Sequence, residues 1–207
     1  MTSPSPLQVD CIYHIFNRGI NGQNLFLEDR NYRHFLKLYT HHIEPVADTY
    51  AYCLLPNHFH LLVRVETEAE QRAYHDATLK VSEIFRVSSA SQGFGNLFNA
   101  YTKAMNQAYQ RTGSLFEHPF HRLLVTTDAY FTQLVVYIHQ NPQRHGLIDD
   151  FRRWPYSSYG ALRADAPTRL KRDTVLARFG GIDALAAAHH HDEVDHRLKA
   201  ALADDFR

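Results

Sequence analysis

Two histidines separated by one residue are the side chains of this sequence best suited to chemistry. His58 and His60 stand in the stretch Pro-Asn-His-Phe-His-Leu-Leu-Val. If this stretch is a β-strand, both imidazoles share one face, while Phe59 and Leu61 on the other face can pack into a core. Two imidazoles on a rigid strand can hold a divalent cation. The triplet alone is a weak signal in a chain with 15 histidines, so its meaning depends on the rest of the sequence.

A second set of candidate residues lies downstream, in a stretch with helical spacing. Tyr137 and Asn141 are four residues apart and therefore share one face of a helix. A tyrosine nucleophile and an oxygen ligand arranged in this way can both approach a metal-bound phosphate. His139 projects to another side and is a poorer ligand. Neither signal is specific alone, because such a tyrosine is usually a core aromatic and Asn141-Pro142 also reads as a helix terminator.

The elements that must position these residues follow from periodicity and turn signals. We expect strands over 11–17, 49–55, the histidine stretch and 120–126, a loop over 88–95, and helices over 30–42, 66–86, 96–111 and from Thr127 or Asp128 to about 141. This order predicts an α+β fold, a ferredoxin-like or RRM-like antiparallel sheet (split βαβ) with helices on one face.

Composition narrows the class of protein. The 207 residues include 22 basic and 22 acidic side chains, a balance that argues against an indiscriminate polyanion binder but allows a local basic face. Cys11 and Cys53 lie in apolar runs, where we expect small buried side chains in a reducing compartment. The first ten residues do not read as a signal peptide, and no apolar run approaches the roughly 18 residues of a membrane span. We therefore expect a cytoplasmic protein with no membrane partner.

The C-terminal part is less informative. We expect one domain over 1–160, followed over 161–207 by a basic segment and a helical tail. Seven Lys or Arg against two Asp stand between residues 152 and 178, which fits either DNA backbone contacts or an ordinary solvated surface. We interpret His189 to His191 as part of a solvent-exposed terminal helix.

Five stretches of the sequence resemble the motifs of one protein family and stand in the same order. They are Tyr-His-Ile-Phe-Asn-Arg-Gly (13–19), Leu-Pro-Asn-His-Phe-His-Leu-Leu (55–62), Arg-Thr-Gly-Ser-Leu-Phe (111–116), Tyr-Ile-His-Gln-Asn-Pro (137–142) and Trp-Pro-Tyr-Ser-Ser-Tyr (154–159). From Tyr13 to Tyr159 the chain resembles the single-tyrosine HUH transposases, in particular the REP-associated tyrosine transposases. Five motifs in the order of the family are a far more specific signal than the His-x-His triplet alone.

The resemblance implies a metal site and a nucleophile. By it, His58 and His60 bind the metal, Asn141 is a third ligand and Tyr137 attacks a DNA phosphate to form a 5′-phosphotyrosine. It also implies Mg²⁺ or Mn²⁺ as cofactor, whereas imidazole ligands alone favour zinc or another transition metal. The expected partner is single-stranded or hairpin DNA. Candidate DNA-contacting residues are Arg18, Lys103, Arg111, Arg122, Arg152 and Arg153.

Two features depart from the family, and two other functions stay open. The segment 68–98 is longer than in compact members, and the net charge is less basic than expected. The alternatives are a catalytically silent DNA-binding regulator on the same fold and a metal-dependent nuclease that uses water in place of Tyr137. The sequence leaves open a monomer or a homodimer, and whether Tyr137 acts in cis or in trans.

Overall fold

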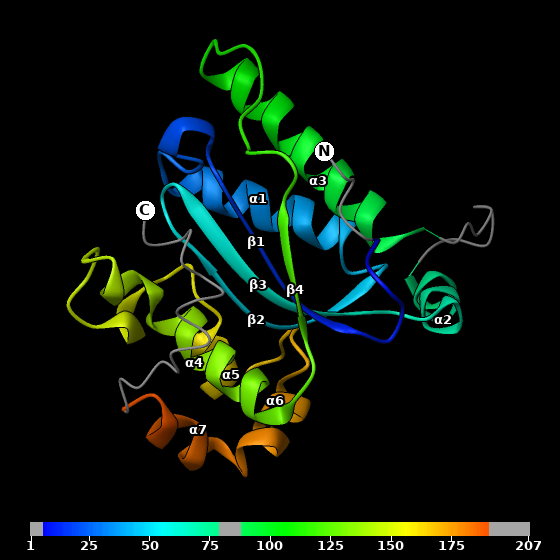
Figure 1. The fold of residues 1–207 in the computed structure, drawn as a ribbon, viewed down its shortest axis with the longest axis vertical. Helices are drawn as coiled ribbons and strands as arrows, with labels where there is room; N and C mark the ends of the chain where they lie inside the picture. Colours follow the sequence, from blue (N-terminus) through cyan, green and yellow to red (C-terminus); the bar gives the residue numbers. More distant parts are fainter. Residues whose placement is uncertain (1–5, 79–87, 191–207) are drawn as a thin grey trace.

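A four-stranded antiparallel sheet forms the centre of the molecule in a computed structural model, which describes residues 6–78 and 88–190 (Figure 1). The strands are β1 (Ile12–Arg18), β2 (Ala47–Leu54), β3 (His58–Val65) and β4 (His121–Val125), in the spatial order β2-β3-β1-β4. β3 is inserted between β2 and β1, and β1 also pairs with β4. This is the split βαβ arrangement that the sequence predicted.

Helices cover both faces of this sheet, so the expectation of helices on one face was wrong. The helices are α1 (Asp29–His42), α2 (Glu68–Thr78), α3 (Ala90–Ala108), α4 (Asp128–Arg144), α5 (Tyr159–Arg163), α6 (Arg172–Phe179) and α7 (Ile182–Ala188), with 3₁₀ turns η1 (Ile20–Gly22) and η2 (Phe151–Arg153). Figure 1 shows α1 and α3 on one side and α4 to α7 on the other. The physical reason is that β1 carries apolar side chains on both faces: Ile15 packs toward α1 and α3, and Phe16 toward α4.

The register of the strands decides which face carries the histidines. Phe16 pairs with His60, and Arg18 pairs with His58. Side chains of residues paired in a sheet share a face, so both histidines face α4. Phe59 and Leu61 lie in the core between the sheet and α1 and α3, as the alternation predicted.

Several helix boundaries differ from the prediction. α3 begins at Ala90, capped by Ser89, so the expected loop over 88–95 is largely helix. Gly93 looked like a loop residue, but its missing side chain allows close packing, since a Cβ there would lie 2.8 Å from the His42 carbonyl oxygen. α4 continues through Pro142 to Arg144, so this proline lies in the last turn of the helix and does not end it. α2 is described from Glu68 to Thr78, and residues 79–86 of that predicted helix lie outside the described residues.

Among the described residues, no helix is both long enough and apolar enough to cross a membrane.

A charged cluster lies at the end of β3 opposite the histidines. Arg64 binds Asp48 at 2.5 Å and Glu70 at 2.7 Å, and Lys171 binds the other oxygen of Asp48 at 2.8 Å. Glu66 lies beside this cluster and is only 7% exposed. Burial, together with the negative charge of Asp48, raises the pKa of Glu66 to about 7.

The raised pKa makes folding stability depend on pH. Folding favours the protonated Glu66 carboxyl, so its contribution is fully present below pH 4.5 and is lost as the pH rises toward 7. A glutamine does not ionise, so we expect the Glu66→Gln variant not to lose this contribution as the pH rises. Its free energy of unfolding should therefore increase relative to that of the parent as the pH is raised from 4.5 to 7. Urea unfolding at pH 5 and pH 8 measures the difference. The exposed Glu68→Gln is the matched control, and equal pH responses of all three proteins would contradict the assignment.

Candidate active site on the α4 face of the sheet

β3 holds His58 and His60 side by side, with their ring centroids 5.2 Å apart. Both side chains are buried, at 9% and 0% exposure. The Nδ1 atom of His58 lies 2.7 Å from Oδ1 of Asn57. A carboxamide oxygen only accepts hydrogen bonds, so His58 carries its proton on Nδ1 and its Nε2 atom keeps a lone pair. This is the tautomer that a metal ligand coordinating through Nε2 requires.

α4 and its C-cap bring a row of residues against these histidines. The ring of Tyr137 lies edge-on to His60 with centroids 5.5 Å apart, and the ring of His145 lies 4.8 Å from that of His58. Asn141 is fully buried halfway between Tyr137 and His145, four residues from each. Residues four apart share a face of a helix, so Asn141 faces the same part of the sheet as its neighbours in the row. The structure therefore brings the predicted nucleophile and the three predicted ligands into one site.

The donor atoms present fit a divalent cation. Within the described part of the chain, Nε2 of His58 and Oδ1 of Asn141 are buried without a hydrogen-bond partner. The Nδ2 group of Asn141 donates to the Tyr137 carbonyl oxygen at 3.1 Å, which fixes the amide. No cluster of three or more His, Cys, Asp or Glu side chains among these residues is arranged to bind a metal. A cation here would thus rest on two imidazoles and an amide oxygen, leaving positions for oxygen atoms of a substrate.

Burial keeps both imidazoles neutral, as metal ligation demands. It lowers the pKa of His60 to about 3, with a further contribution from His145. The pKa of His58 also lies well below its ordinary value because of burial, and because of the nearby His60, His145 and Arg18. Both side chains are therefore available as lone-pair donors at neutral pH.

Two histidines of this site escaped the sequence analysis. His14 on β1 lies 3.0 Å from His60, measured between Nε2 of His14 and Nδ1 of His60. Strand alternation could have indicated that His14 and Phe16 share a face of β1. The sequence alone did not show that β1 pairs with β3, which brings His14 to His60. His145 continues the four-residue spacing of Tyr137 and Asn141 by one more step, beyond the proline that was expected to end the helix.

Two comparisons found known proteins that are similar to this chain, one by sequence and one by structure. No protein-family model matches the chain. A curated protein of Haemophilus influenzae named as a REP-associated tyrosine transposase is 27% identical over 112 residues, which cover 54% of this chain and 58% of the relative. A solved structure described as a REP-associated tyrosine transposase bound to a REP hairpin has a TM-score of 0.57 at 16% identity, covering 81% of this chain and 88% of that one.

The resemblance to REP-associated tyrosine transposases is confirmed. The curated match extends over less than two thirds of the relative's length, and the structural match shows the shared fold.

The predicted DNA-contacting residues are spread over the molecule. Arg18 lies nearest the site, opposite His58 in the sheet, with a side chain 42% exposed and bound to Glu117 at 2.8 Å. Arg122 pairs with Ile15 and so lies on the other face of β4 from the histidines, with its guanidinium over the Phe120 ring at 4.0 Å. The others are Lys103, exposed on α3, Arg111, which binds Gln23 and Asn106, and Arg152 and Arg153, exposed on η2. Their role in DNA binding stays a prediction.

The basic segment 152–178 is less free to bind DNA than its composition indicates. Four of its seven cationic side chains bind carboxylates: Arg152 to Asp150, Arg169 to Glu44, Lys171 to Asp48 and Arg178 to Asp128. Apolar side chains of residues 161–190 also pack into the same core as α4. This part of the chain thus supports the helix that carries Tyr137.

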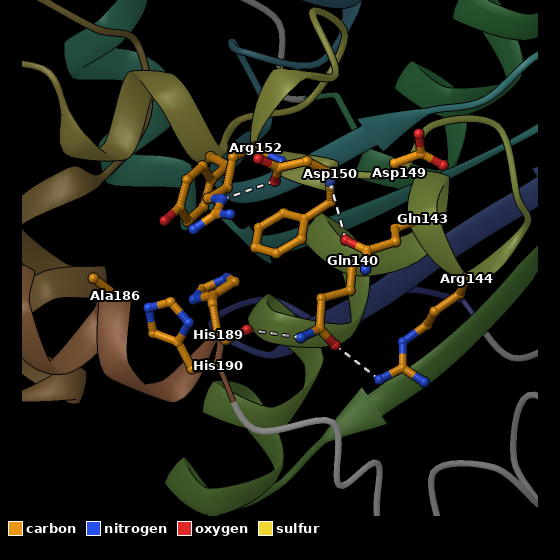
Figure 2. A pocket seen from close by; sticks show the side chains of 11 residues that line it. Gln140, Gln143, Arg144, Asp149, Asp150, Arg152, Ala186, His189 and His190 are labelled. Atoms are coloured by element: carbon orange, nitrogen blue, oxygen red, sulfur yellow. Dashed lines mark hydrogen bonds and ion pairs between the residues drawn. The ribbon is translucent and has the colours of Figure 1, made fainter.

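A polar cavity of about 400 Å³ lies beside α4, outside the candidate site (Figure 2). Its lining side chains largely satisfy one another. Gln140 donates to the His189 carbonyl oxygen at 3.0 Å and accepts from Arg144 at 2.7 Å, while Arg152 binds Asp150 at 2.7 Å. We therefore do not include this cavity in the candidate site.

Next to this cavity, two buried histidines tie α7 to α4. His139 lies 2.8 Å from His189 through Nδ1 and 2.8 Å from Ser158 Oγ through Nε2. His189 is only 4% exposed, so its assignment to a solvated tail was wrong. The reason is that its partner lies 50 positions away along the chain. His190 is exposed as expected, and His191 lies outside the described residues.

We expect His189→Ala to lower the free energy of unfolding by about 1–3 kcal/mol, because it leaves a buried nitrogen of His139 without its partner. Urea denaturation measures this change. The exposed neighbour His190→Ala is the matched control and should unfold like the parent. Equal stability of the two variants would show that the buried pair does not hold α7 on α4.

Proposed function

We propose that this protein is a metal-dependent transposase that cleaves and rejoins single-stranded DNA at REP-like hairpins through a covalent tyrosine intermediate. The observation that carries the proposal is the position of Tyr137, whose ring lies 5.5 Å from that of His60 in the same buried site as His58 and Asn141. The names of the two similar proteins, one a tyrosine transposase and the other such an enzyme bound to a REP hairpin, support the substrate class.

The proposed reaction exchanges one phosphodiester for another. The hydroxyl oxygen of Tyr137 bonds to the phosphorus, and the bond from phosphorus to the 3′ oxygen breaks. The phenolic proton leaves to solvent, and the released 3′ oxygen takes up a proton. The product is a 5′-phosphotyrosine with a free 3′-hydroxyl, and attack by a 3′-hydroxyl on that ester rejoins the strand. Storage of the bond energy in the ester removes the need for a nucleotide cofactor.

His58, His60 and Asn141 would hold Mg²⁺ or Mn²⁺ in this proposal. The cation supplies charge neutralisation at the phosphate oxygens. The protein supplies positioning: Asn57 orients His58, and the bond from Asn141 to the Tyr137 carbonyl oxygen aligns the amide with the nucleophile's own turn of α4. Arg18, opposite His58, adds a positive charge where a DNA backbone would approach.

A covalent-adduct assay tests the proposal. Hairpin DNA from the flanks of the protein's own gene, with single-stranded arms and a label on either side of the expected cut, is incubated with Mg²⁺ or Mn²⁺. We expect a protease-sensitive adduct that carries only the label 3′ of the cut, together with a released strand that ends in a 3′-hydroxyl. Cleavage without an adduct would favour the water-dependent nuclease, and binding without cleavage the silent regulator.

A further inference from the structure

We propose that His14 is a positioning residue that accepts a hydrogen bond from His60 and thereby fixes the tautomer in which His60 binds the metal. This inference rests on the proposed function, because it takes His60 as a metal ligand. The resemblance to the transposase family gave roles to His58, His60, Asn141 and Tyr137, and none to His14.

The contact joins two buried rings on adjacent strands. Nε2 of His14 lies 3.0 Å from Nδ1 of His60, and both side chains are 0% exposed. The ring of His14 is held by stacking on Phe16, with centroids 4.8 Å apart, and faces the Tyr137 ring edge-on at 6.4 Å. The orientation of His14 is therefore set by packing on both sides, as a positioning residue requires.

A hydrogen bond between two neutral imidazoles can run in either direction, but only one direction suits a metal. If His14 donates, the proton of neutral His60 lies on Nε2, and that nitrogen has no lone pair to give. If His60 donates from Nδ1, its Nε2 lone pair is available. A cation on Nε2 of His60 thus requires His14 as the acceptor. Asn57 fixes the tautomer of His58 in the same way, because its Oδ1 atom can only accept a hydrogen bond from Nδ1 of His58.

The second nitrogen of His14 argues against a purely structural role. Nδ1 of His14 is buried and has no hydrogen-bond partner within the described part of the chain. An unsatisfied polar atom in the core costs folding free energy, and an apolar ring of similar size would avoid that cost. The polar atom that does form a bond, Nε2, is the one that faces His60.

The test compares His14→Phe, which removes the acceptor, with His14→Gln, which offers an amide oxygen in its place. Mn²⁺ binding is measured directly by electron paramagnetic resonance on the full chain without DNA. We expect His14→Phe to weaken Mn²⁺ binding about 10–100-fold, as loss of an outer-shell partner does, and His14→Gln to recover most of the affinity. At saturating Mn²⁺, the His14→Phe protein should regain its maximal cleavage rate, which a misfolded variant would not.

The control variant lies on β4, the strand that pairs with β1. In the parent, the ring of His121 on β4 stacks on Phe16 with centroids 4.8 Å apart, and it does not lie beside His60. His121→Phe keeps a ring at this position, so its Mn²⁺ affinity should match that of the parent. Nitrogen-15 NMR of the metal-free parent is expected to show a proton on Nδ1 of His60 that is hydrogen-bonded to Nε2 of His14. Absence of that proton, or unchanged Mn²⁺ affinity in His14→Phe, overturns the inference. A parent that binds Mn²⁺ in this way but forms no DNA adduct overturns the proposed function instead.

Discussion

Replacing Tyr137 by phenylalanine is expected to abolish the covalent DNA adduct and to slow strand cleavage by at least about a thousandfold, the scale of losing a covalent nucleophile. The substitution removes one oxygen atom from a side chain that is 1% exposed and otherwise surrounded by core residues. The ring that packs in this core is kept, and thermal unfolding of the variant shows whether it is folded under the conditions of the assay. Adduct and cleaved strand are measured on the same denaturing gel.

Tyr130→Phe is the matched control for this experiment. Tyr130 lies on the same helix, two turns before Tyr137, and is half-buried against the same core. It loses the same atom, and the adduct yield should equal that of the parent. Full cleavage by the Tyr137 variant would refute the covalent mechanism and leave the water-dependent nuclease as the better description.

The second large effect is expected for the double variant His58→Ala/His60→Ala. Without the two imidazoles, only Asn141 remains of the proposed ligands, so the protein should lose Mn²⁺ binding and, with it, cleavage by roughly a thousandfold or more. Hairpin binding should persist, because backbone contacts depend on cationic side chains elsewhere. Mn²⁺ titration, gel shift and cleavage assay separate these three properties.

His41→Ala/His42→Ala is a suitable double control. These residues end α1, on the opposite face of the sheet, and their rings contact each other at 4.6 Å. The control should bind Mn²⁺ and cleave like the parent. Thermal unfolding of both double variants shows whether the site variant is folded, and Mn²⁺ binding retained by a folded His58/His60 variant would place the cation elsewhere.

The sequence was informative wherever a local pattern determined the outcome. Strand alternation placed His58 and His60 on one face and Phe59 on the other, and helical spacing placed Tyr137 with Asn141. These patterns need no knowledge of distant residues. The order of the elements then led to the sheet arrangement through the rules of the split βαβ unit.

The features that sequence reasoning missed depend on contacts between distant residues. His14 reaches His60 across a strand pairing of 46 positions, and His189 is buried by His139 at a separation of 50. Gly93 was interpreted as loop because its reason for being glycine, the close approach of the α1 backbone, is visible only in three dimensions. Val175 and Leu185, which follow the expected division at residue 160, pack into the core beneath α4, and the division itself stays a prediction.

The burial of Tyr137 has a consequence for control of the reaction. Tyr137, the proposed nucleophile, is only 1% exposed, so in this arrangement its side chain is closed to solvent and to a DNA phosphodiester. If the proposed function holds, a cut made at random in a chromosome would endanger the cell. Under the proposed function, the Tyr137 hydroxyl would become reactive only when a bound substrate displaces the packing between α4 and the sheet.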